Sequence, residues 1–138
     1  MLRHRSQISK RVLIVVADPA MRALLGSAVT NEGYEAVIVR DGREAFRIFK
    51  TDADFSAALF DLSVPGLSGI ELTRHMRTEK RLMRIPVMTI TEQKGLKELS
   101  DSFAAGATAF LCKSFTEDQL QNALRILLST ATLTSIAA

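Results

Sequence analysis

Apolar runs and amphipathic segments alternate along this chain, and the alternation repeats five times. The runs that we expect to form strands are 12–16, 36–39, 57–60, 86–90 and 109–112. The first run, VLIVV, is continuous and mostly β-branched, which is typical of a strand buried on both faces. The segments that carry apolar side chains at helical spacing are 21–29, 45–49, 68–76, 96–105 and 120–128. This order predicts an α/β fold, with helices on both faces of a five-stranded parallel sheet.

Residues that favour helix ends support these boundaries. Asp18 is expected to cap the first helix, with Pro19 at its first position. Gly33 is expected to end that helix, and Gly106 is expected to end the helix over 96–105. The predicted helices therefore have local start and stop signals as well as periodicity.

The chain has 138 residues, which suits one domain of ordinary size. Its hydrophobic fraction of 47% and charged fraction of 24% are ordinary for a globular protein with one core. We predict a basic N-terminal tail over 1–10, a folded domain over 11–128 and a fraying C-terminal tail over 129–138. A DNA-binding output module is not expected, because no residues remain to form one.

The net charge and the absence of membrane or export signals bear on whether nucleic acid or a membrane is a partner. The net charge is +3 and the sequence pI about 9.4, with part of the excess in Arg3, Arg5, Lys10 and Arg11. We interpret this cluster as a solvated leader, and nucleic acid is not expected as a partner. No apolar run approaches the roughly 20 residues of a membrane span, and no signal peptide is present, so we expect a cytoplasmic protein without a membrane partner.

Cys112 and His75 have side chains that could be reactive or bind a metal, but we expect both to have structural roles only. The one cysteine, Cys112, excludes an intrachain disulfide and fits a reducing compartment. We expect it to be a small core hydrophobe on a central strand. His75 is expected on an exposed helix face, with no partner at metal-ligand spacing.

Three polar residues end or directly follow predicted strands: Asp61, Thr91 and Lys113. In open parallel sheets the chemistry lies at the carboxyl ends of the strands, so we expect these side chains to cluster at one edge. A carboxylate can attack phosphorus and become an acyl phosphate, while an ammonium and a hydroxyl bind the phosphoryl oxygens. No nucleotide-binding glycine motif is present. The set therefore predicts a phosphoryl-accepting site.

From about Arg11 to Leu128 the chain resembles the receiver domains of response regulators in two-component signalling, the CheY-like family. The stretches that carry the resemblance, in matching order and spacing, are RVLIVVADPAMR, GYEAVIVRDGREAF, ALFDLSVPGLSGIEL, IPVMTITE and AAGATAFLCKSF. The resemblance implies the flavodoxin-like strand order. It also implies a histidine kinase or phosphorelay protein as phosphoryl donor, and a downstream protein effector.

The resemblance assigns roles to individual positions. Asp61 matches the phosphoacceptor. Thr91 matches the residue whose hydroxyl moves toward the phosphoryl group, and Lys113 matches the lysine that pairs with the phosphoryl group. Phe110 matches the aromatic switch position. The effector is expected to dock on helix 96–105, strand 109–112 and the last helix.

The end of the first strand departs from the family. Receivers usually carry there an acidic pair that helps to bind Mg²⁺, and Val16 and Ala17 replace it. Asp18 lies one place later and is interpreted as the helix cap. Asp61 and the carbonyl of Ser63 then remain as ligands, so we expect Mg²⁺ binding to be weak at most and no other cofactor. Without the acidic pair, Lys113 is expected to pair with Asp61 alone.

Two further departures lie near Lys113. Glu92 stands where the family usually has a small residue, and its carboxylate could repel a phosphoryl donor or, as a lesser alternative, supply a substitute metal ligand. Ser114 replaces a proline that commonly follows a cis bond. Because a cis bond before serine would cost about 3 kcal/mol, the geometry of the loop around Lys113 is left open.

These residues leave two main functions open. The first is a single-domain response regulator that accepts a phosphoryl group on Asp61 in a phosphorelay and signals by protein contact. The second is a pseudo-receiver, a phosphorylation-independent interaction module with the same fold. An enzyme is not expected: phosphatases of the haloacid dehalogenase type carry a second aspartate two residues after the nucleophile, where this chain has Ser63. Lys94 and Lys97 are expected to steer an acidic effector, and a homodimer is left open.

Overall fold

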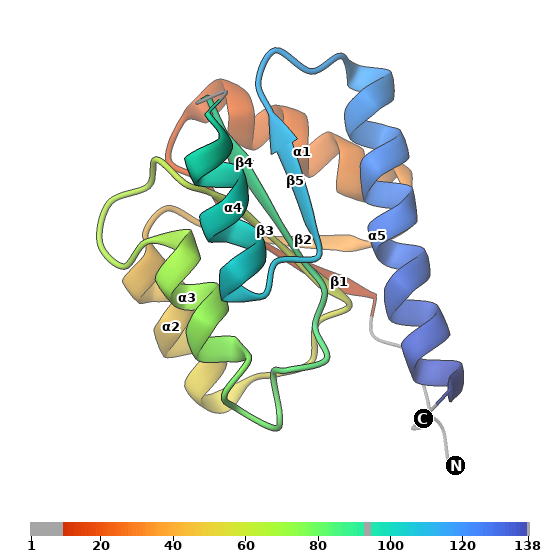
Figure 1. The fold of residues 1–138 in the computed structure, drawn as a ribbon. Coiled ribbons are helices and arrows are strands. Elements are labelled where there is room, and N and C mark those ends of the chain that lie inside the picture. The colour runs from red at the N-terminus through yellow and green to blue at the C-terminus, as the bar shows by residue number, and fades with distance from the viewer. Residues whose placement is uncertain (1–9, 93–94, 138) are drawn as a thin grey trace.

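A computed structural model describes residues 10–92 and 95–137, with side chains up to Thr130. Strands and helices alternate throughout (Figure 1). The elements are β1 (Arg11–Val15), α1 (Pro19–Asn31), β2 (Glu35–Val39), α2 (Gly42–Thr51), β3 (Ala57–Asp61), α3 (Gly69–Met76), β4 (Val87–Thr91), α4 (Leu96–Ala105), β5 (Ala109–Cys112) and α5 (Glu117–Ala137).

The five strands form one parallel sheet in the order β2-β1-β3-β4-β5. Helices α1 and α5 cover one face, and α2, α3 and α4 cover the other (Figure 1). The predicted fold class and the flavodoxin-like strand order are therefore confirmed. All five strands point the same way, so their carboxyl ends meet at one edge of the sheet.

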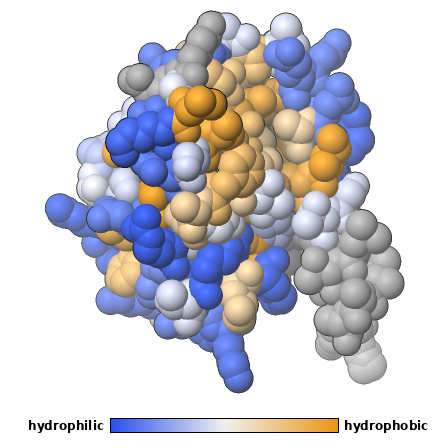
Figure 2. Space-filling model, viewed as in Figure 1, coloured by the Kyte–Doolittle hydropathy of each residue, from blue (hydrophilic) through white to orange (hydrophobic). Residues whose placement is uncertain are grey.

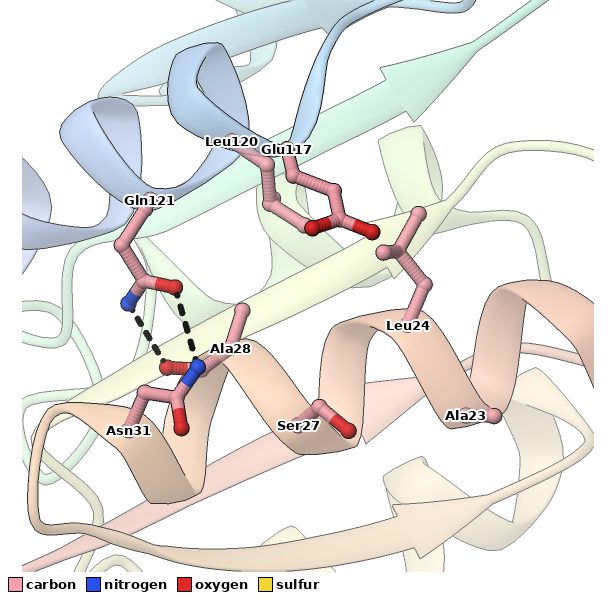
Figure 3. Close-up of a pocket in the computed structure, with 8 residues that line it drawn as sticks. All are labelled: Ala23, Leu24, Ser27, Ala28, Asn31, Glu117, Leu120 and Gln121. Atoms are coloured by element: carbon pink, nitrogen blue, oxygen red, sulfur yellow. Dashed lines mark hydrogen bonds between the residues drawn. The ribbon is translucent and has the colours of Figure 1, made fainter.

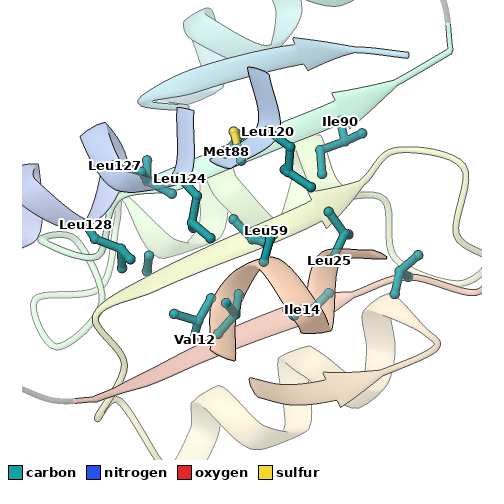
Figure 4. Close-up of a cluster of buried hydrophobic side chains, with 14 of the residues drawn as sticks. Val12, Ile14, Leu25, Leu59, Met88, Ile90, Leu120, Leu124, Leu127 and Leu128 are labelled. Atoms are coloured by element: carbon teal, nitrogen blue, oxygen red, sulfur yellow. The ribbon is translucent and has the colours of Figure 1, made fainter. Parts of the chain in front are cut away.

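Two hydrophobic clusters hold the helices to the sheet, one on each face. Along β1, Val12 and Ile14 pack toward α1 and α5, whereas Leu13 and Val15 pack toward α2 and α3. Figure 4 shows the first cluster, in which leucines of α5 and Leu25 of α1 meet side chains of the central strands. Burial on both faces is the reason that the first strand is an uninterrupted apolar run.

The predicted helix ends are present. The Asp18 carboxylate accepts a hydrogen bond of 2.8 Å from the Met21 amide and so caps α1. Ser68 and Glu71 form a reciprocal capping box at the start of α3. Gly106 closes α4 with φ of 108°, a backbone conformation that favours glycine.

The last helix is longer than expected. Helix α5 continues to Ala137, past the boundary at Leu128, whereas the sequence predicted a fraying tail from residue 129. The buried Leu127 and Leu128 anchor this part of the helix, and neither glycine nor proline follows to end it. The division into a domain over 11–128 with a tail at each end stays a prediction. Arg3 and Arg5 lie outside the described residues, whereas Arg11 begins β1 and forms a 2.9 Å ion pair with Asp52, so it is not part of a solvated leader.

Two single-residue expectations were wrong. Strand β5 is at the edge of the sheet, so Cys112 is half-buried and does not lie on a central strand. The His75 ring is also half-buried, because it packs on the Phe46 ring of α2 at 4.8 Å between centroids. No helix among the described residues is both long and apolar enough to cross a membrane.

Candidate functional site

The carboxyl edge of the sheet brings the predicted site residues together. Asp61 ends β3, Thr91 ends β4 and Lys113 directly follows β5. The backbone amide of Lys113 donates a hydrogen bond of 2.8 Å to the Thr91 carbonyl. The side-chain ammonium Nζ of Lys113 lies 3.9 Å from Oδ2 of Asp61. The clustering expected for these three residues is therefore present.

Asp61 is a buried carboxylate, with 1% of its surface exposed. Its Oδ1 accepts two hydrogen bonds from Ser63, one of 3.0 Å from the amide and one of 2.8 Å from the hydroxyl. Its Oδ2 faces the Lys113 ammonium. Hydrogen bonds and a nearby cation offset the cost of burying a carboxylate. The sequence pointed only to the carbonyl of Ser63 as a ligand, although an aspartate side chain commonly accepts a hydrogen bond from the backbone amide two residues on.

Lys113 has a second carboxylate partner. Oε2 of Glu92 lies 3.0 Å from Lys113 Nζ, closer than Oδ2 of Asp61 at 3.9 Å. The expectation that Lys113 pairs with Asp61 alone was therefore wrong. The register explains the contact: Thr91 pairs with Cys112 across β4 and β5, so the next residue of each strand lies at the same level.

The end of β1 brings no carboxylate of its own to this site. Val16 is fully buried in the cluster below α1 and α5, and Ala17 is exposed. The Asp18 carboxylate is occupied with the Met21 amide. Within the described residues, no group of three or more histidine, cysteine, aspartate or glutamate side chains could hold a metal ion. A hard cation such as Mg²⁺ needs several oxygen ligands, so these residues do not fit the metal site that is usual in the family.

A hollow of about 420 Å³ opens next to Asp61, between the residues that follow β3 and the start of α4. Its lining residues are Leu62, Ser63, Ile70, Thr91, Glu92, Glu98 and Asp101. Three of these carry carboxylates, so the approach to the site is acidic. Asp101 forms a 2.9 Å ion pair with Lys97, and this hydrogen bond raises the pKa of the lysine. Lys97 is thus engaged within α4, and Lys94 lies outside the described residues.

The remaining candidates lie on the β5 side of the site. Phe110 is half-buried on β5, opposite Thr89 of β4. Ser114 is exposed, and no peptide bond among the described residues is cis. The structure thus places Phe110 at a strand interior and Ser114 in the loop that follows Lys113.

A second hollow, of about 450 Å³, lies between α1 and α5 (Figure 3). Gln121 of α5 crosses toward α1 there and donates to the Ala28 carbonyl at 2.9 Å. Asn31 of α1 donates to the Gln121 side chain at 3.5 Å. None of the predicted site residues lines this hollow, so it is separate from the site around Asp61.

The chain matches one family model and several known proteins. The family model described as Response regulator receiver domain matches residues 12–125. The chain is 28% identical over 121 residues to the chemotaxis protein CheY1 of Helicobacter pylori, which covers 87% of this chain and 98% of that protein. It is 32% identical over 117 residues to the transcriptional regulatory protein TcrA of Mycobacterium tuberculosis, covering 85% of this chain and 45% of that protein.

A solved structure agrees with these sequences. The receiver domain of a sensor histidine kinase from Pseudomonas aeruginosa PAO1 superposes with a TM-score of 0.77 at 25% identity, over 88% of this chain and 98% of that one. That receiver holds a magnesium ion coordinated in its active site cleft. The likeness therefore extends over nearly the whole fold.

Proposed function

This chain belongs to the response regulator receiver domain family, and from that premise we propose that it accepts a phosphoryl group on Asp61. The observation that carries the proposal is the buried Asp61 carboxylate, which faces the Lys113 ammonium at the carboxyl edge of the sheet. A carboxylate in this position can act as a nucleophile. Lys113 and the Thr91 hydroxyl would bind the phosphoryl oxygens.

The proposed reaction is a single transfer without enzymatic turnover. A carboxylate oxygen of Asp61 attacks phosphorus, and a P–O bond forms as the bond between phosphorus and the donor breaks. With a phosphohistidine donor, the imidazole nitrogen leaves with the bonding electron pair and takes a proton from water. The product is an acyl phosphate on Asp61. A histidine kinase or a phosphorelay protein is the proposed donor, and the cytoplasm is the proposed location.

We propose that Mg²⁺ assists this site weakly at most. The ligands that the described residues can offer are the Asp61 carboxylate and the Ser63 carbonyl, and Glu92 is already paired with Lys113. One or two carboxylates with phosphate oxygens can hold Mg²⁺, so binding would depend on the incoming phosphate.

The proposed output surface is the face formed by α4, β5 and α5. Leu96 and Phe103 of α4 are 79% and 46% exposed, and Ile126 of α5 is 68% exposed. Figure 2 shows apolar surface over α4 and β5, bordered by hydrophilic side chains. Phe110 has no hydroxyl, so packing alone sets the position of its ring. An exposed apolar patch with a polar border is typical of a protein-binding surface.

A second function, that of a pseudo-receiver, is favoured by two observations. Val16 is sealed into the core where the family carries an acidic residue, and Glu92 engages the lysine that would bind the phosphoryl group. In this alternative the same face binds its partner without phosphorylation.

Intact-protein mass spectrometry after incubation with acetyl phosphate, with and without Mg²⁺, tests the proposal. We expect the mass of one phosphoryl group to be gained by the natural protein and not by Asp61→Asn. Amide NMR spectra of the same samples should then show shifts in α4 and β5. The pseudo-receiver would be favoured if neither protein gains the added mass, or if Asp61→Asn gains it as the natural protein does.

A further inference from the structure

Lys113 is shared between two carboxylates of unequal exposure. Oε2 of Glu92 lies 3.0 Å from its ammonium, and Oδ2 of Asp61 lies 3.9 Å from it. The Glu92 side chain is 69% exposed, whereas those of Lys113 and Asp61 are 20% and 2% exposed. The nearer partner is therefore the one on the outside, where a phosphoryl donor must arrive.

The other two carboxylates of the hollow are directed elsewhere. Asp101 pairs with Lys97 at 2.9 Å. The Glu98 carboxylate lies over the start of α4, since its Oε1 would be 2.9 Å from a Cβ placed on Gly95. Among the described residues, Glu92 is thus the carboxylate of this hollow that contacts Lys113.

We infer that Glu92 is a positioning residue that holds the Lys113 ammonium and thereby limits phosphorylation by small anionic donors. The inference rests on the proposed function of Asp61 as phosphoacceptor. Its physical basis is competition, because the phosphoryl oxygens and the Glu92 carboxylate need the same ammonium. Asp61, Glu92 and Lys113 together carry a net charge of −1, and the end of β1 supplies no cation site to offset it.

Competition between Glu92 and the phosphoryl oxygens for Lys113 should affect small donors more than protein donors. A small donor such as acetyl phosphate must displace Glu92 with the attraction of its own phosphoryl group alone. A protein donor also gains free energy from contacts elsewhere on the surface, and that free energy can offset the loss of the ion pair. In either reaction the Asp61 oxygen bonds to phosphorus as the donor bond breaks, and acetate leaves as the anion when acetyl phosphate is the donor.

The test compares Glu92→Gln with Glu98→Gln, which removes the same charge from the same hollow without touching Lys113. With acetyl phosphate as donor, Glu92→Gln should be phosphorylated about fivefold faster than the natural protein, as expected for release of a partly exposed ion pair. Glu98→Gln should stay near the natural rate. The gain should shrink as ionic strength rises, because salt screens exposed charges.

A second measurement tests the ion pair without any phosphorylation. Denaturation midpoints are compared for Glu92→Gln, Lys113→Met and the double variant, and the pair predicts shifts that are not additive. Additive shifts would overturn the inference, as would equal phosphorylation rates for Glu92→Gln and Glu98→Gln. If neither the natural protein nor Glu92→Gln gains a phosphoryl group, the proposed function fails together with the inference. If the natural protein is phosphorylated but Glu92→Gln is no faster, the inference fails alone.

Discussion

At the scale of single residues, Ser63 and Lys113 offset the cost of burying the Asp61 carboxylate. Its two oxygens have separate partners, with Ser63 donating twice to Oδ1 and Lys113 facing Oδ2. Both hydrogen bonds on Oδ1 come from within two residues of Asp61, so they form with the local turn. The buried carboxylate is thus accommodated by hydrogen bonds and one ammonium, with no repulsion from the acidic pair that is usual in the family.

Restoring that pair should restore the binding of Mg²⁺. Titration calorimetry should give a Val16→Asp, Ala17→Asp double variant an affinity for Mg²⁺ at least about tenfold higher than that of the natural protein, because a hard cation gains two carboxylates beside Asp61. Asp18→Asn serves as a control and should leave the affinity unchanged, since Asp18 caps α1. Equal affinities for the natural protein and the double variant would show that Glu92 or Asp18 already supplies the missing ligands.

At the scale of elements, a buried hydroxyl pair joins β4 to α4. The Thr89 hydroxyl donates to the Ser102 hydroxyl at 3.0 Å, and both residues are fully buried. Thr89 lies two positions before Thr91 on the strand, and α4 belongs to the proposed output face. The pair therefore links the strand that ends in the site to the helix that a partner would contact.

Each hydroxyl of this pair should contribute to the free energy of unfolding mainly through its hydrogen bond with the other. Thr89→Val and Ser102→Ala should each lower the free energy of unfolding by about 1–2 kcal/mol, because each leaves a buried hydroxyl without its partner. The double variant should lose less than the sum of the single losses. Urea denaturation of the four proteins gives the coupling directly, and additive losses would mean that the hydroxyls act independently.

At the scale of the whole molecule, Val16 belongs to the core rather than to the site. It joins the cluster that packs α1 and α5 against the sheet, and the neighbouring Ala17 is exposed. The replacement of the acidic pair thus extends the apolar core to the carboxyl end of β1. At position 16, an apolar side chain stabilises the fold but cannot bind a cation, whereas a carboxylate could bind a cation but would destabilise the fold.

This opposition predicts the effect of the acidic pair on stability. In EDTA, Val16→Asp should lower the free energy of unfolding by roughly 2 kcal/mol or more, because it places a carboxylate in a buried apolar position. Ala17→Asp should change it by less than about 0.5 kcal/mol, as is usual at exposed positions. Denaturant midpoints of the double variant should rise again with Mg²⁺, since binding to the folded state stabilises it. Equal midpoints for Val16→Asp and the natural protein in EDTA would contradict the argument.

The sequence by itself determined the order of the elements, the caps at Asp18 and Gly106, and the meeting of Asp61, Thr91 and Lys113. Local periodicity encodes strands and helices, and parallel strands necessarily end at one edge of the sheet. Only the tertiary structure decided that Glu92 holds Lys113, since that contact depends on the register between β4 and β5 and on side-chain direction. It likewise decided that Val16 is sealed in the core and that Cys112 lies half-buried on an edge strand, because burial depends on which elements pack above a residue and not on its neighbours in the chain.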